Sequence, residues 1–341
     1  MTTSYERTSA GLRHYANMTQ AAIADHLGRT GLSTPLHDMV MDYPARGGKG
    51  IRPALLMATC QAYGRPAEEA LPAAVSLEMM HNAFLIHDDV EDESRVRRGQ
   101  PALHEMYGIG LAVNAGDTLA QLALEPIRNA TGLGSRLTNR LISELRLVVR
   151  QATEGQAQEL GWRRDNRVDL SDADYLDMAG RKTCWYTTVA PLRMGAIVGS
   201  TGTTSLDALS LFGYYLGLAF QIRDDLLDLD TGLSPGSQTW GDIAEGKRTL
   251  ILIHLLARAN DADRSWLLDY LNVPDSRTAT DPARVLALMA RYGSRTYAEQ
   301  YGEHMESAAR SAFEEAFAQL PDSEAKRFLK ELIPFMLARP A

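Results

Sequence analysis

Residues 77–92, LEMMHNAFLIHDDVED, begin apolar and end in a run of carboxylates. In an α-helix, residues three or four apart lie one above another. One helical face would then carry Leu77, His81, Phe84, Asp88 and Asp92. The stretch therefore predicts a helix whose apolar face leads down from a pair of aspartates.

The same arrangement returns in residues 213–228, GYYLGLAFQIRDDLLD, where Gln221, Asp224 and Asp228 share a face. Carboxylates at i and i+4 repel each other on a bare helix by about 0.2–0.5 kcal/mol per pair, so two such clusters invite a cation. Mg²⁺ typically takes one or two carboxylates and fills its other positions with water and substrate phosphates. The two clusters together predict a grip for a Mg²⁺-bound diphosphate, whereas a single cluster would more often be a solvated helix end.

Helical spacing of apolar residues continues along most of the chain, and few stretches have the alternation of a strand. Breaks of Gly, Pro, Asp and Ser fall at residues 44–50, 64–66, 132–135, 199–204, 231–241 and 274–282. They leave roughly ten helices, and Ser171 or Asp172 is available to cap one of them. With 341 residues, 45% of them hydrophobic, we expect one all-α domain over residues 1–341.

Composition limits the function. A formal charge of −8 argues against a nucleic-acid partner, while a small anionic substrate needs only a local group of cations. The N-terminus lacks the apolar core of a signal peptide and no run reaches 18 apolar residues, which predicts a cytoplasmic protein without a membrane span. Cys60 and Cys184 have no cysteine neighbour and are expected to be ordinary buried thiols.

Cationic segments flank both clusters. Residues 45–53, ARGGKGIRP, form a Gly-rich turn that brings Lys49 and Arg52 to a helix start, where backbone N–H groups also favour phosphate. Arg97 and Arg98 follow the first cluster by five and six residues. Lys182 and Thr183 interrupt an apolar helix, and Lys247 follows the second cluster. Because a buried lysine is rare unless it is paired, Lys182 favours a functional role.

LIHDDVED followed by RRG, and FQIRDDLLD followed by GDIAEGKRT, resemble the two aspartate-rich motifs of trans-isoprenyl diphosphate synthases, with KTCWYTT between them. The resemblance runs from about residue 46 to about residue 250. It implies a large helical bundle around a central cavity, usually homodimeric. It also implies a Mg²⁺-dependent prenyltransferase that condenses isopentenyl diphosphate with an allylic diphosphate.

The resemblance also implies roles for individual residues. Asp88, Asp92 and Asp224 would ligate Mg²⁺, supported by Asp89, Asp225 and Asp228. Lys49, Arg52, His81 and Arg98 would bind isopentenyl diphosphate. Arg97, Lys182, Thr183, Gln221 and Lys247 would bind the allylic diphosphate, and the catalytic set would be Asp88, Asp92, Arg97, Lys182, Asp224 and Lys247. Two departures weaken diphosphate contacts: Gly50, where the family usually has Arg, and residues 237–239, where many members have Lys.

Product length should depend on the residues below the first cluster. Phe84, four residues before Asp88, would lie about 6 Å below it in a helix, whereas Ala83 at the fifth position is small. One aromatic residue that a chain can bypass suggests geranylgeranyl diphosphate as the product, with farnesyl diphosphate as the alternative.

Three other functions stay open at this stage. A terpene cyclase would need no second diphosphate site, yet Lys49, Arg52, His81 and Arg98 are present. A non-catalytic partner subunit would be expected to lose aspartates, and none is missing. A Mg²⁺ phosphohydrolase would use His-Asp ligand pairs, which His87-Asp88 superficially offers.

Overall fold

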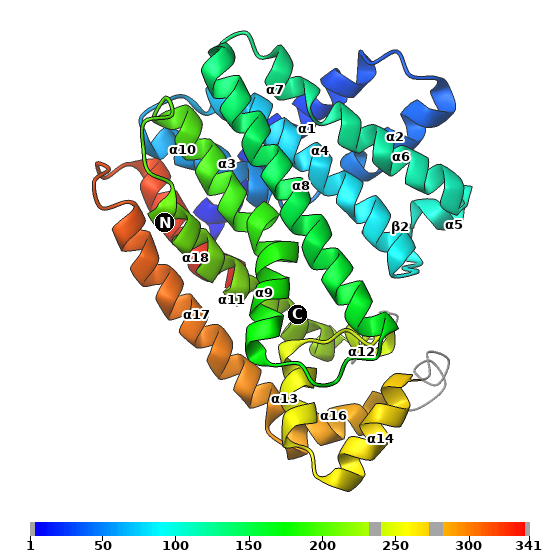
Figure 1. Ribbon diagram of the computed structural model, residues 1–341. Coiled ribbons are helices and arrows are strands. Elements are labelled where there is room, and N and C mark those ends of the chain that lie inside the picture. Colours follow the sequence, from blue (N-terminus) through cyan, green and yellow to red (C-terminus); the bar gives the residue numbers. More distant parts are fainter. Residues whose placement is uncertain (1–3, 232–239, 273–281, 338–341) are drawn as a thin grey trace. The chain divides into compact units, whose positions relative to one another are not determined.

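The computed structural model describes residues 4–231, 240–272 and 282–337, and nearly all of its regular structure is helical (Figure 1). The predicted all-α class is confirmed. The chain divides into two compact units whose segments alternate along the sequence. The prediction of a single domain over residues 1–341 is not tested by this division.

The first unit comprises Met1–Val148, Tyr186–Ser210 and Ala316–Leu332. Its helices are α1 (Ser4–Gly28), α2 (Thr34–Ala45), α3 (Ile51–Ala62), α4 (Ala67–Glu91), α5 (Leu103–Tyr107), α6 (Ile109–Leu122), α7 (Glu125–Asn129) and α10 (Ala190–Gly199). It also contains the first part of α8 (Gly134–Arg164) and of α18 (Glu324–Leu337). Strands β1 (Val96–Arg97) and β2 (Gln100–Pro101) form an antiparallel hairpin directly after α4.

The second unit comprises Val149–Trp185, Leu211–Glu315 and Ile333–Ala341. Its elements are α9 (Asp172–Ala179), α12 (Gly241–Glu245), α13 (Leu250–Arg258), α14 (Asp261–Asn272), α16 (Pro282–Arg291) and nearly all of α17 (Ser294–Ala316). Most of α11 (Asp207–Thr231) belongs here, as does the first part of the π-helical segment η1 (Gly180–Val189).

The breaks predicted at residues 44–50, 64–66, 132–135 and 199–204 are confirmed as helix boundaries. Ser171 caps α9, because its side chain accepts a hydrogen bond from the backbone N–H of Asp174 while Asp174 binds the N–H of Ser171. The estimate of roughly ten helices is too low, since short helices such as α5, α7 and α12 are not separated by clear breaks in the sequence.

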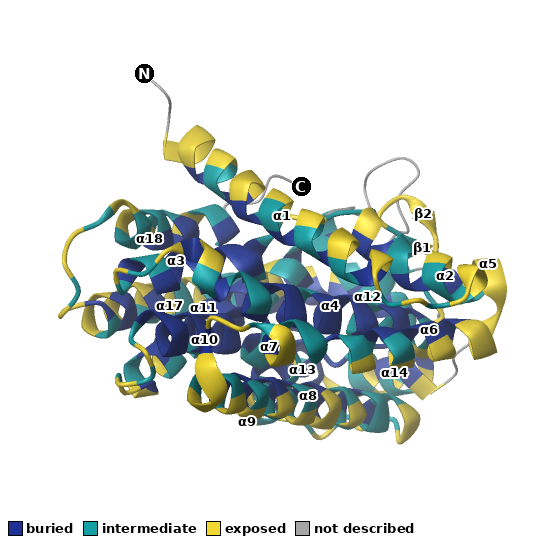
Figure 2. Cartoon of the chain, turned by 90° about the horizontal axis from the view of Figure 1, so that it is seen from above, coloured by how far each residue is buried: buried dark blue, intermediate teal, exposed yellow. Residues whose placement is uncertain are grey.

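Helix α4 forms the centre of the first unit, with α3 beside it and α10 packed against both. Two glycines let α10 approach α3 closely: a Cβ at Gly195 would overlap the carbonyl oxygen of Leu56, and one at Gly199 would lie 2.6 Å from Cβ of Tyr63. Helix α1 buries one stripe of residues and exposes the other, as Figure 2 shows. Close packing thus fixes the second half of α10 against α3.

No helix in the described ranges is long and apolar enough to cross a membrane. Cys60 and Cys184 are buried thiols, as predicted. Burial raises the pKa of Cys60 to about 12, which leaves this thiol protonated and unreactive at neutral pH.

Candidate active site

The first aspartate cluster lies where α4 ends. Asp88 and Asp92 are partly exposed, and the backbone N–H of Asp92 donates to the carbonyl of Asp88 at 2.8 Å as the helix terminates. Carboxylates at a helix C-terminus face the negative end of the helix dipole, so this arrangement is unfavourable without a cation. The position fits a bound Mg²⁺ ion.

Asp89 has a different environment from its neighbours. Its side chain is fully buried and accepts hydrogen bonds from Arg97, whose Nε lies 2.9 Å from Oδ1, and from the hydroxyl of Tyr43. The Tyr43 oxygen in turn accepts the backbone N–H of Leu103 at 3.3 Å. Burial, followed by Asp89, raises the pKa of Tyr43, so its hydroxyl stays protonated and donates. This geometry favours Asp89 as the anchor of Arg97 over direct contact with a metal ion.

The β1–β2 hairpin positions Arg97 and Arg98. Arg46 holds this hairpin by donating to the carbonyls of Arg97 and Pro101, each at 2.9 Å, while its Nε pairs with Asp42 at 2.6 Å. Arg98 has a left-handed backbone, φ 53°, and donates to the carbonyl of Tyr43 at 3.2 Å. Sequence reasoning missed Arg46, because its partners are backbone carbonyls about 50 residues away.

A pocket with an empty volume of about 330 Å³ lies beside Arg98 in the first unit. Its wall includes Gly48 and Gly50, the neighbours of the exposed Lys49, and the side chains of Glu78 and Asn82. One buried oxygen of each of these two side chains has no hydrogen-bond partner within the described chain. The pocket therefore offers the guanidinium of Arg98 and polar side-chain atoms of Glu78 and Asn82 to a ligand.

Arg52 and His81 both lie near Arg98. Nη2 of Arg52 donates to Oγ1 of Thr187 at 2.9 Å, and its guanidinium lies 4.6 Å from the ring centroid of Tyr186. Burial, then the charges of Arg52, Arg98 and Arg97, hold the pKa of His81 well below its usual range. His81 is therefore neutral at physiological pH, and the positive charge comes from the arginines and Lys49.

Gly50 differs from the arginine usual in the resembled family, and the backbone explains why. Its φ is +66°, and a Cβ there would lie 2.6 Å from Cβ of Ala16 on α1. A side chain at this position would be strained by both effects. The other departure, residues 237–239, lies outside the described residues.

The second cluster belongs to the second unit, on α11. Asp225 is buried and accepts hydrogen bonds from the Tyr175 hydroxyl at 2.8 Å and from Nε2 of Gln221 at 2.7 Å. Thr183 donates to Gln221 at 2.8 Å, so the predicted Thr183 and Gln221 belong to one hydrogen-bonded chain ending on Asp225. Tyr175 was missed because nothing in its helical spacing distinguishes it from a core residue.

This cluster holds more negative charge than its surroundings neutralise. Burial, then Asp242, raises the pKa of Asp225 to about 8, and the same causes raise the pKa of Asp228 to about 6. Asp224 is partly exposed on the same helix. Crowded carboxylates with raised pKa values fit a site that a divalent cation completes. No group of three or more potential metal ligands gathers among the described residues.

Lys182 and Lys247 both lie against carboxylates. Lys182, on η1, forms an ion pair with the buried Glu159 of α8. Gly155, one turn before Glu159, lets α8 approach so closely that a Cβ there would overlap the backbone of Lys182. Lys247 pairs with Glu245 at 2.6 Å and with Asp242 at 3.3 Å. Glu159 was missed because it lies 23 residues from its partner.

These groups line one pocket with an empty volume of about 390 Å³. Among its lining residues are Lys182, Thr183, Gln221, Asp225 and Lys247, all predicted to serve the allylic diphosphate or its metal. Arg248 adds a buried cation that donates to the carbonyl of Arg167 at 3.0 Å and to Asn166 at 2.6 Å. Fixed in this way, Arg248 anchors the loop that carries Lys247.

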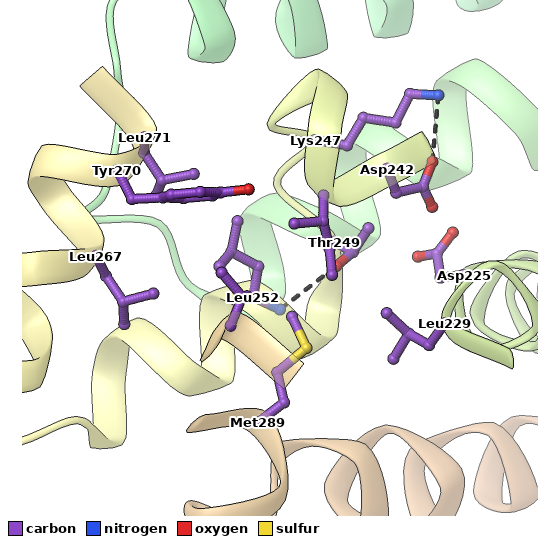
Figure 3. A pocket seen from close by; sticks show the side chains of 12 residues that line it. Asp225, Leu229, Asp242, Lys247, Thr249, Leu252, Leu267, Tyr270, Leu271 and Met289 are labelled. Atoms are coloured by element: carbon purple, nitrogen blue, oxygen red, sulfur yellow. Dashed lines mark hydrogen bonds and ion pairs between the residues drawn. The ribbon is translucent and has the colours of Figure 1, made fainter. Parts of the chain in front are cut away.

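An apolar pocket adjoins the charged one and shares several lining residues with it (Figure 3). Asp225, Asp242 and Lys247 form its polar end, and the apolar side chains around it include Leu267, Leu271 and Met289. Residues 241–249, which begin with helix α12, thus contribute to both a charged pocket and an apolar one. The polar side chains of this segment therefore border both charged and apolar surroundings.

The residues expected to govern product length lie on α4. Ala83 is fully buried, whereas Phe84 is partly exposed and meets the ring of Tyr186 edge to face, with 5.6 Å between the ring centroids. Tyr186 belongs to the KTCWYTT segment, but its contacts with α4 were not predicted.

Comparison with known proteins identifies the family of the chain. The polyprenyl synthetase family model matches residues 34–289. The short chain isoprenyl diphosphate synthase of Methanothermobacter thermautotrophicus is 33% identical over 335 residues, which cover 96% of this chain and 97% of that protein. The crystal structure of a geranylgeranyl pyrophosphate synthetase from Pyrococcus horikoshii superimposes with a TM-score of 0.85 at 28% identity, covering 99% of this chain and all of the other.

A second crystal structure includes ligands. The geranylgeranyl pyrophosphate synthase of Corynebacterium glutamicum, complexed with isoprenyl diphosphate and magnesium, has a TM-score of 0.79 at 25% identity, and 99% of each chain is covered. The fold and the charged pockets together define a helical isoprenoid synthase. The chain belongs to the polyprenyl synthetase family and is a trans-prenyltransferase.

Proposed function

We propose that this trans-prenyltransferase condenses isopentenyl diphosphate with an allylic diphosphate in a Mg²⁺-dependent reaction that yields geranylgeranyl diphosphate. The observation that carries the proposal is the pocket in which Lys182, Lys247 and Arg248 surround the crowded carboxylates of Asp225 and Asp242. Such a pocket suits a metal-bound diphosphate, because neither the anion nor the carboxylates would be stable there without a cation.

The metal assignment follows from exposure. We assign Mg²⁺ to the partly exposed Asp88, Asp92 and Asp224, with Asp228 in support. Asp89 and Asp225 are buried and already accept hydrogen bonds, so we assign them to orienting Arg97 and Gln221. When bound, Mg²⁺ would neutralise charge on the departing diphosphate.

The protein's own groups then have separate tasks. Arg97, Lys182 and Lys247 stabilise the negative charge that grows on the leaving diphosphate as the allylic C–O bond breaks. Lys49, Arg52, His81 and Arg98 hold isopentenyl diphosphate so that its double bond attacks the allylic carbon. A new C–C bond forms, and the proton lost from the adduct passes to the released diphosphate.

Replacement of single aspartates tests the assignment. Asp88→Ala and Asp224→Ala should each lower turnover by about 10²-fold or more, since each removes a group that acts on the transition state. Labelled isopentenyl diphosphate offered with each allylic primer measures the activity, and circular dichroism checks the fold. Glu91→Ala, an exposed neighbour of Asp88, is the control. Near-normal turnover of either aspartate variant in Mg²⁺-replete buffer would contradict the proposal.

The same assay separates the other functions left open by the sequence. A terpene cyclase would release hydrocarbons without consuming isopentenyl diphosphate, and a phosphohydrolase would release phosphate from either substrate alone. A non-catalytic subunit would do neither. The pocket beside Arg98 favours the synthase, because it supplies a second place for a diphosphate.

The twenty-carbon product is the finer part of the proposal. A growing chain that runs down α4 from Asp88 would reach Phe84, whose ring is only partly exposed, and then Ala83. Phe84→Ala should lengthen the product and Ala83→Phe should shorten it, because both change the space below the aspartates. Chromatography of dephosphorylated products measures the length. If both variants made products of the wild-type length, the residues that limit product length would lie elsewhere, and the product assignment would lose its basis.

We further propose that the protein works as a homodimer. Five large apolar side chains near the turn between α5 and α6 are between 37% and 63% exposed: Met106, Tyr107, Ile109, Leu111 and Val113. Such a patch is typical of a protein contact. Light scattering of Ile109→Glu should report a monomer, whereas Leu211→Glu, at a single exposed leucine elsewhere, should not. The cytoplasmic location predicted from the sequence stays a prediction, which fractionation of the source cells would test.

A further inference from the structure

The ring of Tyr186 makes three contacts in the first unit. The guanidinium of Arg52 lies 4.6 Å from its centroid, and the His81 ring stacks on it with centroids 5.7 Å apart and 30° between the planes. Phe84 meets it edge to face, with centroids 5.6 Å apart and 75° between the planes. One aromatic side chain thus contacts two residues assigned to isopentenyl diphosphate and one assigned to product length.

Arg52 depends on this neighbourhood for its orientation. Its Nε is buried without a hydrogen-bond partner among the described residues, and Nη2 donates to Thr187, the residue next to Tyr186. A cation over a tyrosine face is held by the quadrupole of the ring. Tyr186 and Thr187 therefore fix the guanidinium plane from one side and leave its remaining donors to a ligand.

Phe84 is positioned by the same ring. It is only partly exposed, and an edge-to-face contact restricts the angle of its own ring. His81, which is neutral, packs against the ring and does not compete with Arg52 for charge. A movement of Tyr186 would therefore displace both the groups that hold the isopentenyl diphosphate and the side chain that limits the chain.

We propose that Tyr186 is a positioning residue that couples the isopentenyl diphosphate site to Phe84, the side chain that limits product length. The coupling acts through the contacts of Tyr186 with Arg52, His81 and Phe84. This inference rests on the proposed function. All three contacts use the ring of Tyr186 and none requires its hydroxyl. The coupling predicts that loss of the ring changes isopentenyl diphosphate affinity and product length together, whereas loss of the hydroxyl changes neither.

The test compares Tyr186→Phe, which keeps the ring, with Tyr186→Leu, which removes it. Isothermal titration gives the affinity of the Mg²⁺-loaded protein for isopentenyl diphosphate, steady-state kinetics gives KM for each substrate, and chromatography gives product length. We expect Tyr186→Leu to weaken isopentenyl diphosphate binding about tenfold and to alter product length, with the allylic KM within about twofold of wild type. Tyr186→Phe should match wild type in all three measurements.

Thermal unfolding shows whether each variant folds, and Tyr186→Met replaces the leucine variant if that one does not. Equal rises in both KM values, an unchanged product length in the ringless variants, or equal damage from Phe and Leu would each overturn the coupling. A wild-type protein that fails to condense the two substrates would instead overturn the proposed function, and this inference with it.

Discussion

The cationic side chains of the two units differ in the groups that they contact. In the first unit, the guanidinium groups of Arg52 and Arg98 bind a hydroxyl, an aromatic ring and a backbone carbonyl, all of them uncharged. In the second unit, Lys182 and Lys247 form ion pairs with carboxylates. The carboxyl group of Glu78 lies near both arginines, but burial raises its pKa, whereas the two lysines of the second unit are paired directly with carboxylates. From this difference we predict that isopentenyl diphosphate binds without a metal and that the allylic diphosphate binds with one.

Metal removal should separate the pockets most strongly. With a chelator present, we expect the affinity for an allylic diphosphate to fall by about 100-fold or more, because its carboxylate-rich pocket then repels the anion. The affinity for isopentenyl diphosphate should change by less than about threefold. Titration calorimetry of each ligand, before and after Mg²⁺ is restored, measures both. Equal losses for the two ligands would remove the distinction.

Arg52→Ala should come next in size. Loss of a charge-assisted hydrogen bond, worth about 1.5–3 kcal/mol, corresponds to a rise of about 10–100-fold in KM for isopentenyl diphosphate. The allylic KM should stay within about twofold, because the interaction is local. Arg65→Ala, which removes an arginine just beyond the end of the same helix that pairs with Glu69, is the control in steady-state kinetics. A parallel rise in both constants would mean that the cations are not divided between two sites.

Glu159→Gln tests the ion pair of Lys182 in the second unit. Without its carboxylate, Lys182 loses the group that fixes its ammonium, and we expect kcat to fall about tenfold while the isopentenyl diphosphate KM is unchanged. Glu154→Gln provides a matched control on the same helix, because Glu154 pairs with the surface residues Arg150 and Arg181. A Glu159→Gln enzyme with wild-type kcat would show that the ion pair has no part in turnover.

The smallest expected effect is a change in the free energy of unfolding when glycines with positive φ are replaced. Gly50 and Gly31 both have positive φ, but only a Cβ at Gly50 would meet another residue closely. Gly31→Ala should lower the free energy of unfolding by about 1 kcal/mol, and Gly50→Ala by about 1 kcal/mol more, because the overlap with Ala16 is added. Chemical denaturation measures both values. Equal losses would show that α1 moves aside without cost.

Much of the architecture follows from local sequence. Helix boundaries at residues 44–50 and 199–204 coincide with Gly and Pro, and helical spacing gave the shared face of His81, Phe84 and Asp88. Helical spacing of this kind reaches only one or two turns along the chain. The family resemblance, rather than spacing, placed Thr183 and Gln221 in one set, and the structure joins them by a hydrogen bond.

The sequence could not predict contacts between residues that are far apart along the chain. Tyr43 and Asp89 are 46 residues apart, and Lys182 and Glu159 are 23 apart, so no local pattern links them. The π-helical turns of η1 were also invisible, because apolar spacing does not distinguish them from an α-helix. The buried positions of Asp89 and Asp225 depend on these partners, and their distinct roles could not be read from two similar motifs.

Helices α1 and α18, which are far apart in the sequence, meet in the first unit. On α1, the hydroxyl of Thr8 donates to Glu331 of α18 across 323 residues, and the ring of Tyr15 packs on Phe328. Further along the same α1, Gln20 and Ile23 line the pocket beside Arg98. Because the two partners are 323 residues apart, this contact closes only after the long segment between them has been made. Contacts between residues so far apart in the sequence form slowly. A nascent chain therefore has its first aspartate motif long before the pocket beside Arg98 is complete.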